Sequence, residues 1–291
     1  MIQHKGMALL QVLLITAIIS ILALYFSLTA REQVKLARLS SERAEAILAI
    51  KTAQSRLFLA LLTEFREPHP NAVDTVLRQW NFYGQPFELN NGVSAKIQDQ
   101  SGLISVNFPD AALIRQMFEQ NGLEASLAPV VTDSLLDWQD ADRLTRLNGS
   151  EQDGYVSGPR NGIITLKSEM ARVRGVSAEI WQKFAPMFTV YQRGPFNPMA
   201  APAPILAGLI GQDRANDYIE RRKTTPFTAS AFSALTGLQE TIEQILYPSD
   251  VMEISLEAKR GEVRAQLKVM VELKPYSGQD ESPVDYLDVQ W

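Results

Sequence analysis

Apolar and polar residues divide the first 66 positions into two kinds of predicted helix. The stretch 7–30 is apolar nearly all round, whereas 31–66 is amphipathic and contains neither proline nor glycine. The apolar side of the second part carries, at helical spacing, Ile47, Ile50, Leu57, Phe58, Leu61, Leu62 and Phe65. Because Pro68 and Pro70 end the pattern, we expect one continuous helix over 7–65, about 90 Å long.

Beyond this helix, short strands bracket a helical block. Turn residues separate three predicted antiparallel strands at 87–89, 93–97 and 103–108. After Pro109 the pattern predicts helices at 110–120, 129–138, 165–174, 177–184, 202–222, 228–234 and 238–246. Strands then return as a hairpin of 251–258 and 263–273, and the polar tail from Pro275 is expected to be loose until Tyr286. The whole pattern predicts an α+β head with a helical domain inserted into it.

Composition excludes several classes of protein. The net charge of −5 argues against a nucleic-acid partner, because phosphate contacts require a basic face. The absence of cysteine removes disulfides and thiolate metal sites. The two histidines, His4 and His69, lie in the N-terminal head and between two prolines, which disfavours a catalytic triad and a histidine-rich metal site. We therefore do not expect an enzyme.

The apolar stretch has three possible roles: a secretory signal peptide, a plain membrane anchor, or a segment that leaves the membrane later. It is too long for the core of a signal peptide, and no convincing small-residue exit site follows it. The small residue stands before it instead, at Gly6, directly after the basic Lys5. This arrangement resembles the leader of type IV prepilins, in which a cut after Gly6 would leave the apolar helix on the mature chain, beginning at Met7. An uncleaved anchor with its positive residues in the cytoplasm stays the alternative.

Gln11 stands where most prepilin-like proteins carry glutamate, five places after the cut. In such fibres this glutamate is thought to neutralise the new amino terminus of the neighbouring subunit, and an unpaired charge in a bilayer costs several kcal/mol. A subunit without the carboxylate could only be the first, at the tip. The alternative is that Gln11 is a neutral residue in an anchor.

An acidic loop in the helical block is the candidate metal site. Its carboxylates are Asp133, Asp137, Asp140, Asp142, Glu151 and Asp153. Calcium takes six to eight oxygen ligands, and a loop with Asn148 and Gly149 between the two groups of carboxylates could fold around an ion. The spacing does not match an EF-hand. A solvated acidic loop remains the alternative interpretation.

Two motifs together resemble a known family. The segment 135–155 reads LLDWQDADRLTRLNGSEQDGY and is similar to the D-W-x-D-x-D … N-G-x-E-x-x-Y signature of the type II secretion minor pseudopilin K family, the general secretion pathway protein K. The segment 97–107 resembles that family's D-x-x-G-x-(I/L)-x-(L/V)-N element, and the leader around Gly6 and the residue at Gln11 also fit.

The resemblance implies a pilin-like fold, in which a long N-terminal helix packs on an antiparallel sheet, with a large inserted all-helical domain. The parts expected are the prepilin leader 1–6, the transmembrane part 7–30 and the amphipathic part 31–66 of the helix, the first part of the head 67–108, the inserted domain 109–247, and the C-terminal strands and tail 248–291.

The resemblance also implies a structural role at the tip of the type II secretion pseudopilus, in starting its assembly and in the export of folded periplasmic proteins. The prepilin peptidase would cut after Gly6, and Met7 would be methylated. The partners implied are the minor pseudopilins I and J and then the major pseudopilin. The chain would sit in the inner membrane with its globular part in the periplasm. The acidic loop would bind calcium, and the ligands that the resemblance implies are Asp137, Asp140, Asp142, Glu151 and Asp153. The alternative is a membrane-anchored periplasmic calcium-binding or hydrolytic domain.

Overall fold

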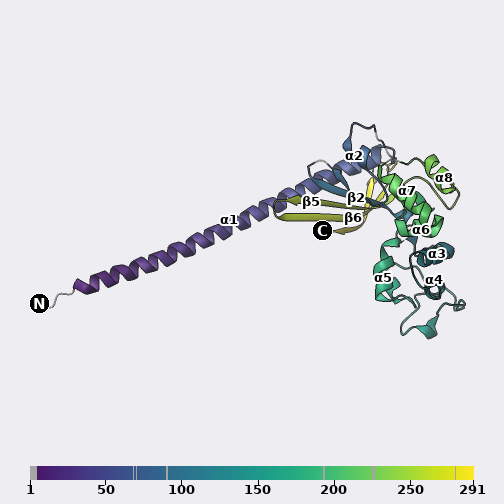
Figure 1. The fold of residues 1–291 in the computed structure, drawn as a ribbon, viewed down its shortest axis with the longest axis horizontal. Helices are drawn as coiled ribbons and strands as arrows, with labels where there is room; N and C mark the ends of the chain where they lie inside the picture. The colour runs from purple at the N-terminus through teal and green to yellow at the C-terminus, as the bar shows by residue number, and fades with distance from the viewer. Residues whose placement is uncertain are drawn as a thin grey trace.

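A single long helix, α1 (Lys5–Thr63, 59 residues), extends from one side of the globular part of the molecule (Figure 1). The computed structural model describes residues 5–67, 69, 71–89, 91–192, 194–224, 227–278 and 280–291. Residues 1–4 of the predicted leader lie outside this set. The backbone of Gly6 and Met7 belongs to α1, but the Met7 side chain lies outside the described part of the chain. The absence of proline and glycine over 31–66 lets the helix run unbroken from its apolar half into its amphipathic half.

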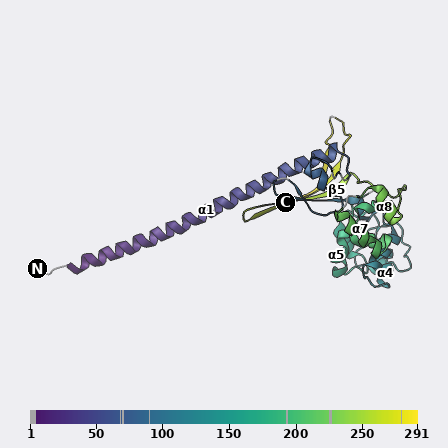
Figure 2. The ribbon, with the colours of Figure 1, turned by 45° about the horizontal axis from the view of Figure 1, so that its top comes forward.

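A five-stranded antiparallel sheet packs against the second half of α1 (Figures 1 and 2). Its order is β1-β2-β5-β6-β7. The strands are β1 (Phe87–Leu89), β2 (Val93–Asp99), β5 (Val251–Arg260), β6 (Val263–Leu273) and β7 (Val284–Gln290). Alternate residues of β2 and β5 are buried, and in register Ile97 lies opposite Ile254. These side chains share one apolar core with Ile50, Leu57 and Leu61 of α1.

The turn between β5 and β6 is docked on α1. The backbone N–H of Glu262 donates to the Glu42 carboxylate over 3.0 Å, and Arg38 pairs with the same carboxylate over 2.7 Å. Gly261 has φ +52°, and a Cβ there would overlap the Glu42 carboxylate. Glycine therefore serves both the left-handed turn and the close approach of the hairpin to the helix.

The helical unit has a hydrophobic core of its own, separate from that of the sheet. Its α-helices are α3 (Ala111–Gln120), α4 (Leu127–Gln139), α5 (Ala178–Phe184), α6 (Ala203–Ile210), α7 (Gln212–Thr224) and α8 (Ala229–Thr236). Short 3-10 turns connect them: η1 (Gln100–Gly102), η2 (Gln152–Gly154), η3 (Lys167–Arg172), η4 (Ala185–Met187) and η5 (Pro198–Ala200). The small helix α2 (Thr75–Gln79) belongs to the head, where Val76 joins the core of the sheet.

The prediction that 103–108 forms a third strand of the main sheet is wrong. Only β3 (Ile104–Ser105) forms there, and it pairs in parallel with β4 (Phe188–Thr189) in a separate two-stranded sheet. The 3-10 turn η1 directs the chain out of the main sheet after β2. A Cβ at Gly102 would overlap the backbone of Ala200, so this turn is packed tightly against the helical unit.

Three predicted helices also differ. The helix predicted at 202–222 is two helices, because Gly211 adopts φ +82° between α6 and α7 and its left-handed backbone breaks the helix. The stretch 238–246 is irregular, and Gln244 forms an isolated bridge with Phe196. The helix predicted at 165–174 is the shorter 3-10 turn η3. The tail orders at Val284, slightly earlier than expected, as β7.

One buried carboxylate joins the head to the helical unit. Asp99 is fully buried at the end of β2 and accepts hydrogen bonds from the backbone N–H and the hydroxyl of Ser101, over 3.0 and 2.7 Å. It also accepts from the backbone N–H and the hydroxyl of Ser249, just before β5, and from Asn197 Nδ2. The same side chain therefore fixes both points at which the chain passes between the sheet and the helical unit.

Candidate functional site

The apolar half of α1 is the candidate membrane segment. Among the described residues, it contains the one stretch that is long and apolar enough to cross a membrane, and none of that stretch is buried against the rest of the protein. The hydroxyls of Thr16 and Ser20 donate to helix carbonyls at Val12 and Thr16, so their polar groups are satisfied within the helix itself. The side chain of Gln11 is exposed. This surface fits lipid or the helices of other subunits.

The candidate metal site lies where α4 ends. Asp137 occupies the last turn of α4, Asp140 is its C-terminal cap, and the following loop returns Glu151 to the same place. One carboxylate oxygen from each of these three residues lies within 4.8 Å of the others. Two oxygens bound to one calcium ion, at 2.3–2.6 Å each, can be at most about 5 Å apart. We call Asp137, Asp140 and Glu151 the acidic cluster.

The loop 141–151 folds back on these carboxylates through hydrogen bonds and one glycine. The backbone N–H of Arg146 donates to Asp137 Oδ2 over 3.1 Å, and its guanidinium pairs with both Asp137 and Asp140. These hydrogen bonds, with that to Asp140 the stronger, raise the pKa of Arg146. A Cβ at Gly149 would overlap the Asp137 carboxylate. Glycine is thus required for the loop to approach the cluster so closely.

Glu151 is the carboxylate of the cluster that lacks protein partners. Its side chain is buried, and neither carboxylate oxygen has a hydrogen-bond partner among the described residues. Burial raises the pKa of the Glu151 carboxyl, and the charges of Asp137, Asp140 and Asp142 raise it further. Asp140 Oδ1 is also buried and without a partner in the described part of the chain. Because an unpaired buried carboxylate is costly, these oxygens fit a bound cation.

The other two predicted ligands lie on the same loops but outside the cluster. Asp142 is exposed and accepts a hydrogen bond from the backbone N–H of Leu144 over 2.7 Å. Asp153 is exposed in η2. Sequence reasoning did not single out Arg146, although an arginine within a run of acidic residues is a signal for a local ion pair.

Aromatic and charged side chains pack next to the acidic cluster. Trp138 stacks edge-to-face on Tyr155 with ring centroids 4.8 Å apart, and its indole N–H donates to Glu169 over 2.9 Å. Arg160 forms an ion pair with Glu169. The Arg160 guanidinium, and secondarily the Trp138 indole, hold the pKa of the Glu169 carboxyl below its usual value. Trp138, the tryptophan of the D-W-x-D segment, therefore fixes the loop next to the acidic cluster.

Comparison with known proteins indicates the family that this chain resembles. A family model described as type II secretion system protein K matches residues 86–193, which include β1, β2 and the acidic cluster. A type II secretion system protein K of Escherichia coli K12 is 26% identical over 210 residues, covering 65% of this chain and 63% of that protein. The protein K of Klebsiella pneumoniae is 28% identical over 211 residues, covering 63% of this chain and 62% of its own length.

By these matches the chain resembles the type II secretion system protein K family. The aligned part spans somewhat less than two thirds of the length of these two relatives. The fold is also similar to a solved structure described as the GspK-GspI-GspJ complex of the enterotoxigenic Escherichia coli type 2 secretion system. That match has a TM-score of 0.59 and 17% identity, and covers 87% of this chain and 98% of that one. The predicted resemblance to this family and the predicted α+β, pilin-like fold class are thereby confirmed.

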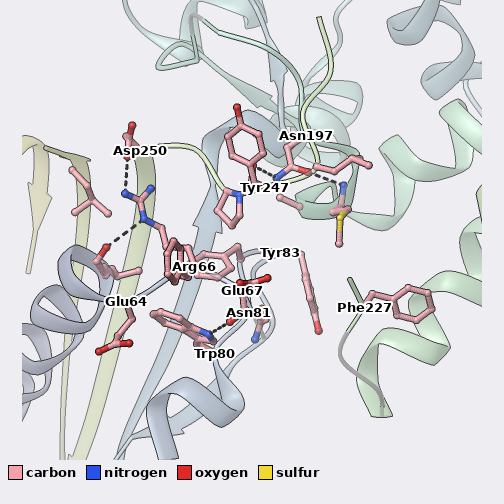
Figure 3. Close-up of a pocket in the computed structure, with 18 of the residues that line it drawn as sticks. Glu64, Arg66, Glu67, Trp80, Asn81, Tyr83, Asn197, Phe227, Tyr247 and Asp250 are labelled. Atoms are coloured by element: carbon pink, nitrogen blue, oxygen red, sulfur yellow. Dashed lines mark hydrogen bonds and ion pairs between the residues drawn. The ribbon is translucent and has the colours of Figure 1, made fainter. Parts of the chain in front are cut away.

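A groove between the head and the helical unit has a volume of about 1530 Å³ (Figure 3). Arg66 pairs with Asp250 over 2.7 Å across one wall. On the other side, the guanidinium of Arg222 from α7 lies over the ring of Tyr83, 3.9 Å from its centroid. The first contact lies within the head, and the second joins the head to the helical unit.

Proposed function

We propose that this chain is a structural minor pseudopilin at the tip of the type II secretion pseudopilus, where it helps to start assembly and the export of folded periplasmic proteins. The observation that carries the proposal is α1, whose exposed apolar half continues into an amphipathic half packed on an antiparallel sheet. Such a helix can leave a bilayer and pack among identical helices of a fibre. The proposed role is non-enzymatic.

The helical unit supports a terminal position. It projects from the head at the end of the molecule remote from the N-terminus (Figure 1). A unit of this bulk is difficult to repeat along a tightly packed fibre. Gln11 offers no carboxylate to neutralise the amino terminus of a subunit already in place, and this also favours the first position.

The partners and location follow from the family and the fold. The prepilin peptidase would cut after Gly6, leaving Met7 as the methylated first residue of a single-pass inner-membrane protein with its globular part in the periplasm. The solved structure of similar fold is a complex with GspI and GspJ. We therefore propose the minor pseudopilins I and J as direct partners, followed by the major pseudopilin.

We also propose that the acidic cluster holds a structural calcium ion. Asp137, Asp140 and Glu151 would supply oxygen ligands, and the ion would supply charge neutralisation and cross-linking of the loop 141–151 to α4. Asp142 and Asp153 stay predicted ligands, placed on the same loops. The support is the set of buried carboxylate oxygens that the protein itself leaves without partners.

Processing of the amino terminus tests the pseudopilin role against its alternative, a membrane-anchored periplasmic calcium-binding or hydrolytic domain. We expect intact-mass spectrometry of the chain, expressed with a prepilin peptidase, to show loss of residues 1–6 and one added methyl group. A Gly6→Leu variant should keep its leader, because the cut requires the small residue. An intact Met1, or a cut near Ala30, would contradict the pseudopilin role and favour the alternative.

A further inference from the structure

The groove between the head and the helical unit has aromatic side chains on both of its walls (Figure 3). Trp80 and Tyr83 belong to the head, and Phe227, which precedes α8, lies opposite Tyr83 on the side of the helical unit. We propose that this groove binds an extended, basic segment of a partner polypeptide. The inference goes beyond the proposed role of the chain, because the groove involves neither the apolar half of α1 nor the acidic cluster.

Exposed aromatic side chains are concentrated at this groove. Outside the apolar half of α1, six of the described aromatic side chains are exposed, and three of them, Phe65, Tyr247 and Tyr276, line it. Phe65 is 80% exposed and Tyr276 is 98% exposed. Aromatic side chains are enriched at binding interfaces, because they bury a large area at a low cost in conformational entropy. Their concentration around one groove therefore indicates a binding surface.

The cations that line the groove are largely occupied within the protein. Three of them form ion pairs, over 2.7, 2.6 and 2.6 Å: Arg66 with Asp250, Lys223 with Glu220, and Lys274 with Asp285. Arg222 lies over the ring of Tyr83. Of the lining cations, Arg78 alone has neither an ion pair nor a ring contact among the described residues. The groove therefore has little free positive charge.

The glutamates that line the groove are not neutralised in this way. Those without an ion pair in the part of the chain that the structure describes are Glu64, Glu67, Glu88, Glu240, Glu272 and Glu281. The groove thus presents an excess of negative charge, which complements the Lys or Arg side chains of a bound segment. It would repel nucleic acid and other phosphate-rich ligands, which require a basic face.

A cation that the protein itself places on the wall shows how a basic side chain fits there. The Arg222 guanidinium lies 3.9 Å from the centroid of the Tyr83 ring and 5.1 Å from that of Tyr218. Aromatic faces attract a guanidinium or an ammonium group within about 6 Å of the ring centroid. The exposed rings of Tyr247 and Tyr276 offer the same contact to a cation of a partner, in the same groove as carboxylates that can accept its hydrogen bonds.

The size of the groove fits a length of chain better than a small molecule. Its volume of about 1530 Å³ exceeds the roughly 300–1,000 Å³ that is typical of small-molecule sites. Aromatic-lined grooves bind extended, proline-rich peptides in other proteins, because the backbone of such peptides is ordered before binding. An extended segment can also place several basic side chains along the lining carboxylates at once.

Binding of peptides that have one length and different charges tests the proposal. The full chain in micelles of a non-ionic detergent is titrated into fluorescein-labelled peptides of four Lys-Pro-Leu, Gln-Pro-Leu or Glu-Pro-Leu repeats, and fluorescence anisotropy is measured. We expect saturable binding of the lysine peptide, at least about tenfold tighter than that of the glutamine peptide, and no binding of the glutamate peptide. The difference should shrink as the salt concentration rises, because exposed charges are screened.

Exposed residues of the groove provide variants that leave the fold in place. Phe65→Ala combined with Tyr276→Ala should weaken binding of the lysine peptide about tenfold or more, because both rings are lost from the rim. Glu64→Gln combined with Glu67→Gln should remove most of the preference for lysine over glutamine, because two of the unpaired charges are lost. Circular dichroism checks that each variant is folded, and if one pair does not fold, the other pair decides.

Two exposed residues outside the groove are the matched controls. Phe108→Ala and Glu119→Gln should leave the affinity and the preference for lysine unchanged. Equal binding of the three peptides, no saturable binding of the lysine peptide, or groove variants that bind like the controls would overturn the proposal. Binding of a chitin hexasaccharide in place of the lysine peptide would assign the groove to glycans and overturn it as well. None of these results depends on processing at Gly6, so their failure leaves the proposed pseudopilin role unaffected.

Discussion

The head and the tip of the helical unit are stabilised in different ways. In the head, α1 and the sheet meet through apolar side chains such as Ile50, Leu57 and Ile254, all fully buried. At the end of α4, by contrast, the protein buries Asp137 and Glu151 and relies on one arginine to balance them. The core of the head consists of apolar side chains that pack on one another. The acidic cluster contains buried carboxylate oxygens that have no hydrogen-bond partner among the described residues.

This difference shows where the protein depends on its surroundings. Apolar burial stabilises the head whatever ions are present, because it depends only on area removed from water. Under the calcium proposal, the acidic cluster depends on a cation from solution, because buried carboxylates without partners oppose folding. We therefore expect the head to respond to changes of side-chain volume and the helical unit to respond to ions and pH.

The largest effect is expected in the core of the head. Leu57→Ala removes a fully buried side chain between α1 and the sheet and should lower the free energy of unfolding by about 2–5 kcal/mol. Leu59→Ala, on the same helix but 63% exposed, is the matched control and should change it by less than about 0.5 kcal/mol. Urea unfolding of the full chain in micelles measures both. Equal losses for the two variants would mean that α1 does not pack on the sheet through this face.

Removal of calcium should have the next largest effect, and only on the helical unit. At a free calcium concentration 100 times the dissociation constant, binding stabilises the folded state by about 2.7 kcal/mol. Chelation should therefore lower the Tm and increase hydrogen exchange in 137–151, while exchange in β5 and β6 stays the same. Glu151→Gln should not respond to chelator. A wild-type Tm that is insensitive to chelation would rule out a structural ion.

A smaller effect is expected from pH through Glu169. Because Arg160 and Trp138 lower the pKa of this carboxyl in the folded state, its contribution to stability is present above the unfolded pKa and is lost as the pH falls through the folded pKa. The wild type should therefore lose more stability between pH 7 and pH 3 than Glu169→Gln does. The difference should be smaller than the two effects above, because Arg160 is partly solvated. Parallel pH profiles for the two proteins would contradict this role.

Much of the head could be predicted from the sequence. The uninterrupted pattern over 31–66 predicted α1, and alternation predicted β2 and the β5–β6 hairpin, because each of these elements shows its own period in the sequence. The irregular path of 238–246 and the change of sheet at Ile104 could not be predicted in this way. Both depend on contacts with distant segments: Phe196 for the first and Phe188 for the second.

For the candidate site, the sequence indicated the acidic loop but not which of its carboxylates come together. All five predicted ligands are carboxylates on one stretch of chain, and the sequence does not distinguish between them. The fold does, because the end of α4 directs Asp137 and Asp140 toward Glu151, while Asp142 and Asp153 stay exposed. Burial and convergence are properties of the packed loop and not of local spacing.

By itself, then, the sequence determined the long N-terminal helix and the resemblance to the protein K family, because the first depends on local periodicity and the second on contiguous motifs. Only the tertiary structure decided that Asp99 bonds to Ser249, 150 residues further along the chain, and that Arg146 lies within the acidic cluster. The physical reason is that the charge balance of a buried site depends on which side chains meet after folding, and that cannot be read from the order of residues alone.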